Sequence, residues 1–152
     1  MTHGADTSFL VAFEIQEHAQ HAAAFSLLEK LLAQKDRIGV TPQVLAEFVH
    51  VVTDGRRFQQ PLSVALALEK SQRWWNAVET DQVMPSSQAL ARFHDWMRRH
   101  QLGRKRVLDT LLAATFREAG IKSLLTLNAA DFTVFGEFAC VPLEAKARPE
   151  AV

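Results

Sequence analysis

The chain has 152 residues, of which 48% are apolar and 22% are charged, a composition typical of a globular protein and not of a disordered or fibrous one. Lys plus Arg number 17 and Asp plus Glu number 17, so the net charge is zero and a globally basic nucleic-acid-binding protein is excluded. The single cysteine, Cys140, excludes an internal disulfide framework and fits a cytoplasmic protein. The apolar run Phe9 to Phe13 is far below the ~18 residues of a membrane-spanning helix, so we expect no membrane segment.

The first half of the chain is predicted to alternate short strands with helices. A first strand at residues 2–5 is expected only from its position in this alternation, because its sequence has little β-propensity. An apolar helix follows from Phe9, and helical spacing of apolar residues predicts another over residues 17–35. The run at residues 38–40 predicts a buried strand. Thr41 and Pro42 then favour the start of a helix that runs to Val52.

The second half continues the same alternation. Ser63 is a good helix N-cap and starts a helical pattern that reaches Val78. The remaining predicted elements are a strand at residues 82–85, a helix from Ser86 or Ser87 to His100 closed by Gly103, a helix over residues 107–119, and strands at residues 123–127 and 139–143. Residues 144–152 are rich in Ala and charge and are expected to form a C-terminal tail.

Strands that alternate with helices predict an α/β fold, because each parallel connection needs a crossover helix that covers a face of the sheet. We therefore expect a three-layer αβα sandwich with a small, mostly parallel sheet. The length suits one domain, which we assign to residues 1–143.

Four acidic residues follow predicted strands or lie in the helices after them, where ligands bind in open parallel sheets: Asp6, Glu47, Asp109 and Asp131. Three of the four also have a structural explanation, since Asp6 can cap a helix, Asp109 can favour a helix N-terminus and Asp131 fits a turn. Glu47 and Asp109 stand beside apolar helix positions, where carboxylates are rare unless paired or metal-bound. A divalent cation such as Mg²⁺ or Mn²⁺ would relieve the repulsion among gathered carboxylates and hold phosphate oxygens.

Segments 6–10, 45–49, 107–115 and 124–132, which carry these four acids in order, resemble the PIN-domain ribonucleases, in particular VapC-type toxins of toxin–antitoxin pairs. Segment 53–58 is similar to one branch of the family, and the resemblance extends over residues 1–143. The chain departs from the family pattern in two places. His3, which we interpret as a terminal residue without a functional role, replaces part of the usual apolar run before Asp6. The fourth acidic position falls at either Asn128 or Asp131, and we favour Asp131.

The resemblance implies a PIN-like fold and a metal-dependent endoribonuclease that uses Mg²⁺, and also Mn²⁺, to activate water against an RNA phosphodiester. Asp6 and Asp109 would bind the primary ion, and Glu47 and Asp131 would complete its surroundings or bind a second ion. Hydrogen bonds from Thr7, Ser8, Thr126 and Asn128 would support these carboxylates. The basic residues expected to bind RNA are Arg104, Lys105 and Arg106, with Arg56 and Arg57 as a second group.

The resemblance also implies partners. VapC-type toxins are typically held inactive by a VapB-like antitoxin whose C-terminal segment covers the active-site groove, and they commonly form homodimers. We expect both for this chain.

Three alternative functions remain open at this point. The first is a catalytically inactive PIN-like module that binds RNA or a protein. The second is a phosphatase with an aspartate nucleophile at Asp6, which is disfavoured because the second Asp expected two residues later is Ser8. A dinucleotide-binding protein is disfavoured further, because the Gly-rich loop is missing.

Overall fold

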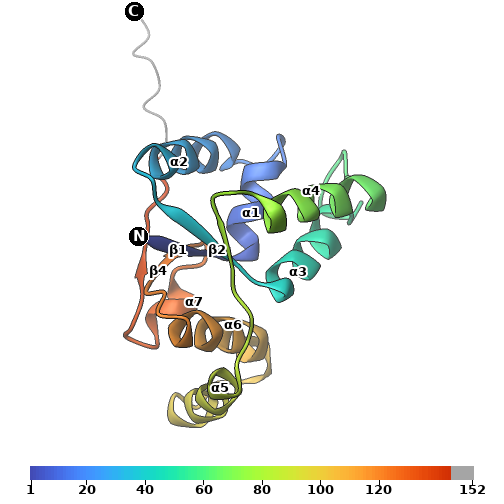
Figure 1. The fold of residues 1–152 in the computed structure, drawn as a ribbon. Coiled ribbons are helices and arrows are strands. Elements are labelled where there is room, and N and C mark those ends of the chain that lie inside the picture. Colours follow the sequence, from blue (N-terminus) through green and yellow to red (C-terminus); the bar gives the residue numbers. More distant parts are fainter. Residues whose placement is uncertain (145–152) are drawn as a thin grey trace, which may run out of the picture.

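A computed structural model describes residues 1–144, and its five strands form one all-parallel sheet (Figure 1). The strand order is β3-β2-β1-β4-β5, with β1 in the centre. The strands are β1 (Thr2–Ala5), β2 (Arg37–Val40), β3 (Thr80–Gln82), β4 (Ser123–Leu125) and β5 (Ala139–Cys140). Apart from Glu144, the expected C-terminal tail lies outside the described residues.

Helices cover both faces of this sheet, which confirms the predicted three-layer α/β/α fold (Figure 1). The chain moves from β1 through β2 to β3 in one direction and then returns past β1 to β4 and β5, so right-handed crossovers put the two groups of helices on opposite faces. One group is α1 (Thr7–Glu14), α2 (His21–Ala33), α3 (Pro42–Val52) and α4 (Val64–Asn76). The other is α5 (Ser87–Arg99), α6 (Val107–Glu118), preceded by a 3-10 turn (Arg104–Arg106), and α7 (Ala130–Thr133). In the part of the chain that the structure describes, no helix combines the length and apolarity needed to cross a membrane.

Local capping explains why several helix starts could be predicted. The side chains of Thr41, Ser63 and Ser86 each accept a hydrogen bond from the backbone N–H three residues later, at 3.1 Å in all three cases. Pro42 occupies the first turn of α3, where its missing N–H costs nothing. These starts are therefore specified by residues adjacent in the sequence.

Other boundaries differ from the predictions. Helix α2 begins at His21 and not at residue 17, and α4 ends at Asn76, which leaves Val78 84% exposed. Strand β3 covers residues 80–82, whereas the predicted strand covered residues 82–85. The apolar residue Val83 is buried but lies just beyond the end of the strand. Gly103 does not close α5, since it caps the 3-10 turn. Strands β4 and β5 end two and three residues earlier than expected, at Leu125 and Cys140.

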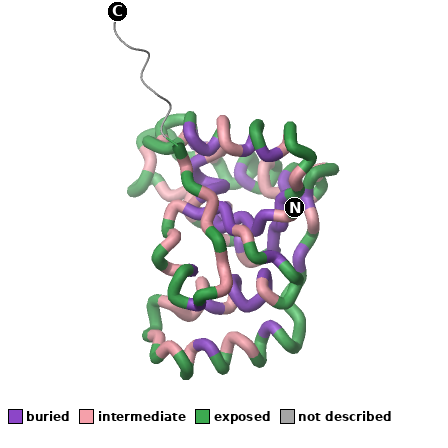
Figure 2. Tube along the Cα trace, turned by 90° about the vertical axis from the view of Figure 1, so that its left-hand side faces the viewer, coloured by how far each residue is buried: buried purple, intermediate pink, exposed green. Residues whose placement is uncertain are grey.

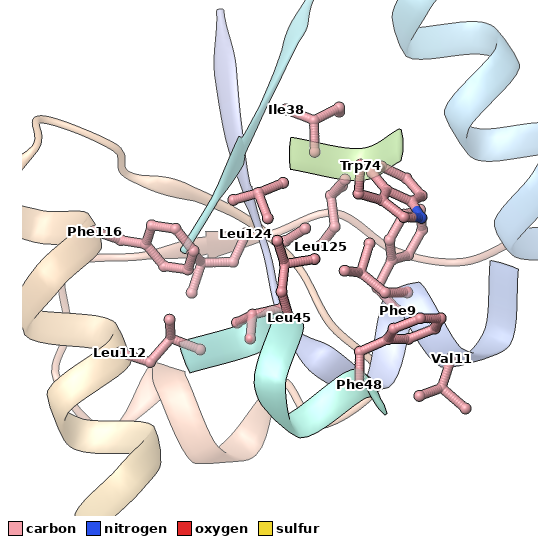
Figure 3. Packing of buried hydrophobic residues seen from close by; sticks show 14 of the residues in the cluster. Phe9, Val11, Ile38, Leu45, Phe48, Trp74, Leu112, Phe116, Leu124 and Leu125 are labelled. Atoms are coloured by element: carbon pink, nitrogen blue, oxygen red, sulfur yellow. The ribbon is translucent and has the colours of Figure 1, made fainter. Parts of the chain in front are cut away.

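The core lies on both faces of the sheet, as the band of buried residues through the middle of the molecule shows (Figure 2). Phe116 and Leu112 of α6 pack on one side, and Phe9 of α1 and Phe48 of α3 pack on the other (Figure 3). All four side chains are at most 1% exposed. The core therefore holds α1, α3 and α6 against the sheet, and these three helices carry Thr7, Ser8, Glu47 and Asp109 of the predicted site.

Gly4 allows the close contact between the central strand and α6. A Cβ atom at Gly4 would lie 2.9 Å from three ring carbons of Phe116, whereas a Cβ atom at Gly103 would meet nothing within 4 Å. Gly4→Ala should lower the free energy of unfolding by about 1–3 kcal/mol because it overpacks the core. Gly103→Ala is the matched control and should change it by less than about 0.5 kcal/mol. Urea unfolding measures both values, and equal effects would contradict this packing argument.

Candidate active site

The candidate site lies between β1 and β4, where the strand order reverses: β2 and β3 are added on one side of β1, and β4 and β5 on the other. The segment after β1 leads to α1 on one face, and the segment after β4 leads to α7 on the other. Such a reversal opens a crevice beyond the carboxyl ends of the two strands. Here the crevice is a pocket of about 510 Å³, and its lining includes Asp6, Glu47, Asp109 and Asn128.

Asp6 is the most tightly held of the acidic residues and is only 6% exposed. Its Oδ1 accepts a hydrogen bond from the backbone N–H of Thr7 at 2.8 Å, so Asp6 also caps α1. Its Oδ2 accepts from the hydroxyls of Thr126 at 2.7 Å and Ser8 at 2.9 Å. Burial raises the pKa of Asp6, and these three hydrogen bonds oppose that rise. The carboxylate is therefore buried but fixed in orientation by α1 and the end of β4.

Glu47 and Asp109 reach the same pocket from two further helices. Glu47 of α3 accepts a hydrogen bond at Oε2 from the Thr7 hydroxyl at 2.9 Å. Asp109 lies in the first turn of α6. Burial, followed by the charges of Asp6, Asp131 and Glu47, raises the pKa of Asp109 to about 6. The pocket therefore concentrates negative charge that the described residues only partly compensate.

The structure separates the two candidates for the fourth position. Asn128 lines the pocket, and its backbone N–H donates to the Thr126 hydroxyl at 3.0 Å. Asp131 is not among the lining residues, and its carboxylate Oδ1 lies 3.5 Å from the Arg106 guanidinium. Its charge is nevertheless near enough to raise the pKa of both Asp6 and Asp109. The preference for Asp131 over Asn128 stays a prediction.

The predicted basic residues differ in their surroundings. Arg106 donates a hydrogen bond to the backbone carbonyl of Asp131 and pairs with its carboxylate, so it is part of the structure around the acids. Arg104 and Lys105 are exposed in the 3-10 turn. The Arg56 side chain is 92% exposed and pairs with Asp54, whereas Arg57 lines the pocket.

Sequence reasoning missed four residues of the pocket, the apolar Val11 and Val51 as well as His18 and Phe58. Phe58 belongs to the segment 53–58 that resembles one branch of the family, which was a usable signal. His18 lies in the turn between α1 and α2, and nothing in the local sequence pointed to the pocket.

The donor chemistry of the pocket fits a divalent cation, although its three carboxylates are too far apart to hold an ion in the present arrangement. Within residues 1–144, no three side chains of His, Cys, Asp or Glu lie close enough to form a ready-made metal cluster. Carboxylate and amide oxygens are nevertheless the ligands that Mg²⁺ and Mn²⁺ prefer. Burial, and after it repulsion from Asp6, Asp131 and Glu47, raises the pKa of Asp109, and a bound cation would relieve that repulsion. A larger pocket of about 970 Å³ beside Met1 and Ser123 offers a weaker donor set, since Asp81 is the one acidic residue among the described residues of its lining.

Comparison with known proteins places this geometry in a family. The family model described as PIN domain matches residues 5–136. Among solved structures, Mycobacterium tuberculosis VapC20, described as a sarcin-ricin loop cleaving toxin, is 20% identical with a TM-score of 0.67, covering 98% of this chain and 100% of that one. Rickettsia felis VapBC2, bound to a DNA fragment from its promoter, is 18% identical with a TM-score of 0.65, covering 93% and 98%.

VapBC-1 from nontypeable Haemophilus influenzae is 13% identical with a TM-score of 0.65, covering 93% of this chain and 97% of that one. No curated protein matches the chain at a significant level. At these identities the solved structures support the fold, and the family model carries the assignment. Since that model matches residues 5–136, which include all four predicted acidic residues, the chain belongs to the PIN-domain family.

Proposed function

We propose that this chain is a divalent-metal-dependent endoribonuclease and the toxin of a toxin–antitoxin pair. The observation that carries the proposal is the convergence of Asp6, Glu47 and Asp109 from three elements on one pocket, where mutual repulsion helps to raise the pKa of Asp109. A pocket with uncompensated negative charge repels a phosphodiester unless a cation is bound. The similarity to a sarcin-ricin loop cleaving toxin supports RNA as the substrate.

Asp6 and Asp109 would hold the primary ion, Glu47 would lie beside it, and Asn128 would offer a neutral oxygen. When bound, Mg²⁺ or Mn²⁺ would activate a water molecule and neutralise charge on the phosphate oxygens. The chain's own part is positioning. Ser8 and Thr126 fix the Asp6 carboxylate, and Thr7 joins Asp6 to Glu47, since its N–H donates to one and its hydroxyl to the other.

Asp131 takes a different part in this proposal from the one expected from the sequence. Its carboxylate faces Arg106, so it would act on the ion through its charge and not as a direct ligand. Asn128 then fills the fourth position. A neutral amide oxygen contributes less affinity than a carboxylate, which favours an ion that exchanges readily with solution.

The proposal includes partners and location. Similar structures named VapBC2 and VapBC-1 support an antitoxin partner for this chain, one that resembles VapB. We further infer from the family resemblance that the protein forms a homodimer and acts in the cytoplasm, where RNA is its substrate.

The proposed activity is tested by incubating the purified protein with a mixed pool of transfer and ribosomal RNA. Mn²⁺ or Mg²⁺ should produce discrete fragments, and excess EDTA should stop their formation. Cleavage that continues in EDTA would contradict a metal-dependent mechanism. The same reaction with an equal amount of a mock purification controls for contaminating ribonucleases.

A second candidate function is a PIN-like module without catalysis that binds RNA or a protein. It is favoured by the neutral Asn128 in the pocket. It is also favoured because, within residues 1–144, no three His, Cys, Asp or Glu side chains lie close enough together to hold a metal ion. It predicts that Mn²⁺ neither raises the melting temperature nor supports cleavage. Thermal unfolding with and without Mn²⁺ therefore distinguishes the two candidate functions, since only the nuclease should gain melting temperature.

A further inference from the structure

The pocket has a second end whose chemistry differs from that of the acidic end. His18, Arg57 and Phe58 line it together with the apolar side chains of Val11 and Val51. We propose that this end binds the nucleotide next to the phosphate being cut, with its base stacked on Phe58 and a flanking phosphate on Arg57. The inference rests on the proposed function, and it names the substrate class as RNA with an unstacked base.

The loop that carries Arg57 and Phe58 is held in place by backbone hydrogen bonds. The N–H groups of Arg57 and Phe58 donate to the carbonyl of Asp54 at 3.1 and 3.3 Å. The carboxylate of Asp54 accepts in turn from the N–H of Arg56 at 2.9 Å. A turn fixed in this way presents both side chains with little loss of conformational entropy when a ligand binds.

A second set of contacts ties this loop to the turn that carries His18. The backbone N–H groups of Gln59 and Gln60 donate to the two carboxylate oxygens of Glu17 at 3.2 and 3.0 Å. Glu17 lies in the same turn as His18, between α1 and α2. The two segments that form the second end of the pocket are therefore joined to each other, which makes this end a built surface.

Arg57 has positive charge available for a phosphate. Its Nε lies 3.7 Å from Asp54 Oδ2, and its side chain is 61% exposed. Asp54 also pairs with Arg56 at 3.2 Å, so one carboxylate faces two guanidinium groups. The segment keeps a net positive charge, which attracts an anionic backbone.

Phe58 supplies a surface for a base. Its ring is half-buried, packs against the hydrophobic core on one side and lines the pocket. Every nucleobase can stack on such a ring, so this contact favours unpaired nucleotides without strong sequence preference. A base inside a duplex cannot reach the ring, which favours RNA loops and single strands over double helices.

His18 adds a hydrogen-bond donor beside these two groups. Its Nδ1 accepts from the backbone N–H of Gln20 at 3.0 Å, so the neutral ring carries its proton on Nε2. Burial and the charge of His21 lower the pKa of His18, which keeps the ring neutral near physiological pH. The volume of about 510 Å³ lies within the ~300–1,000 Å³ of ordinary ligand pockets, so a nucleoside fits beside a phosphate.

The test compares Arg57→Ala and Phe58→Leu with Arg73→Ala, all in an Asp109→Asn background that should not cut RNA. Arg73 is the matched control because its side chain, paired with Glu69, is as exposed as that of Arg57 but does not line the pocket. Binding of a fluorescein-labelled, uridine- and adenine-containing single-stranded 10-mer RNA is measured by anisotropy. Arg57→Ala and Phe58→Leu should each weaken binding about 5- to 10-fold, and Arg73→Ala by less than about twofold.

Thermal unfolding of each variant shows whether it is folded, and Phe58→Leu keeps most of the apolar packing. Equal binding by Phe58→Leu and its parent, or equal losses for Arg73→Ala and Arg57→Ala, would overturn the inference. The nuclease proposal is judged separately, by cleavage with the unmodified chain. If that chain cuts RNA while these variants bind normally, only the inference is wrong. If it does not cut RNA but the variants lose binding as described, the inference stands and the nuclease chemistry is wrong.

Discussion

Asp109→Asn should raise the melting temperature of the metal-free protein by about 2–4 °C near pH 7.5 and remove most of its affinity for Mn²⁺. The pKa of Asp109 is raised from 3.8 to about 6, so the folded protein holds this proton more tightly than the unfolded chain does. The metal-free fold therefore loses stability as the pH rises from about 4 to about 6. An uncharged Asn avoids that loss.

The expected size of this effect takes account of solvent. Asp109 is partly exposed, so water screens its repulsion from Asp6, Asp131 and Glu47. We therefore expect Asp109→Asn to raise the free energy of unfolding by about 1 kcal/mol, which is less than the full pKa shift would give. Near pH 4 the carboxyl is protonated in the folded protein, and the difference between Asp109→Asn and the unchanged protein should nearly vanish. The gain in stability and the loss of metal binding both follow from removing one carboxylate that is partly buried among other negative charges.

Asp95→Asn is the matched control for Asp109→Asn. Asp95 lies on α5 and pairs with Arg99 at 2.7 Å on the surface, where its side chain is 52% exposed. Its replacement should cost about 0.3–0.5 kcal/mol and leave Mn²⁺ affinity unchanged. A lower melting temperature for Asp109→Asn than for Asp95→Asn in metal-free buffer would show that Asp109 stabilises the fold, contrary to the account given above.

Thr126→Val should weaken Mn²⁺ binding about 10- to 100-fold, the usual effect of removing a hydrogen bond to a metal ligand. The Thr126 hydroxyl donates to Asp6 Oδ2 at 2.7 Å, and this is the largest of the hydrogen-bond effects that oppose the rise in the pKa of Asp6. Valine keeps the shape of the side chain but not the hydroxyl. The pKa of Asp6 then rises further, and protons compete better with the ion.

Isothermal titration with Mn²⁺ measures this effect, and its dependence on pH identifies the cause. The difference between Thr126→Val and the unchanged protein should be larger near pH 6 than near pH 8, because protonation of Asp6 is the competing reaction. Thr126→Ser keeps the hydroxyl and should bind Mn²⁺ within about threefold of the unchanged protein. An identical affinity for Thr126→Val would mean that Asp6 is not a ligand.

The fold class could be predicted because most elements are specified locally. The starts of α3, α4 and α5 follow from the capping residues Thr41, Ser63 and Ser86, which act through bonds within one turn. The alternation of these helices with short apolar runs then predicts parallel connections. Hydrophobic pattern and capping were sufficient for the architecture.

The central strand β1 could not be predicted with the same support, because its stability comes from distant residues. Gly4 has poor β-propensity but permits contact with Phe116. His3, interpreted from the sequence as an incidental terminal residue, is 4% exposed and its ring hydrogen-bonds Ser123 at 2.7 Å and Asp36 at 3.0 Å. These partners are 33 to 120 residues away, so local sequence reasoning did not identify them.

The fourth position of the site shows the same limit on a smaller scale. Asn128 and Asp131 lie three residues apart, and sequence chemistry favours the carboxylate. In the structure Asp131 pairs with Arg106 and is not among the lining residues, while the backbone N–H of Asn128, which lines the pocket, donates to Thr126. The position of Arg106 relative to α7 depends on the packing of α6, which the sequence pattern does not specify. Asp6, Glu47 and Asp109, which line the pocket, follow a predicted strand or lie in a predicted helix.

The most direct test of the proposed site is the rate of RNA cleavage in Mn²⁺ by the unchanged protein, Asp109→Asn and Asp95→Asn, purified in parallel. The unchanged protein and Asp95→Asn should cut the same RNA at equal rates, and EDTA should stop both. Asp109→Asn should be slower by at least about 100-fold, the upper end of what loss of a supporting residue alone produces. Equal cleavage by all three proteins would contradict the assignment of the acidic pocket as a metal-dependent ribonuclease site.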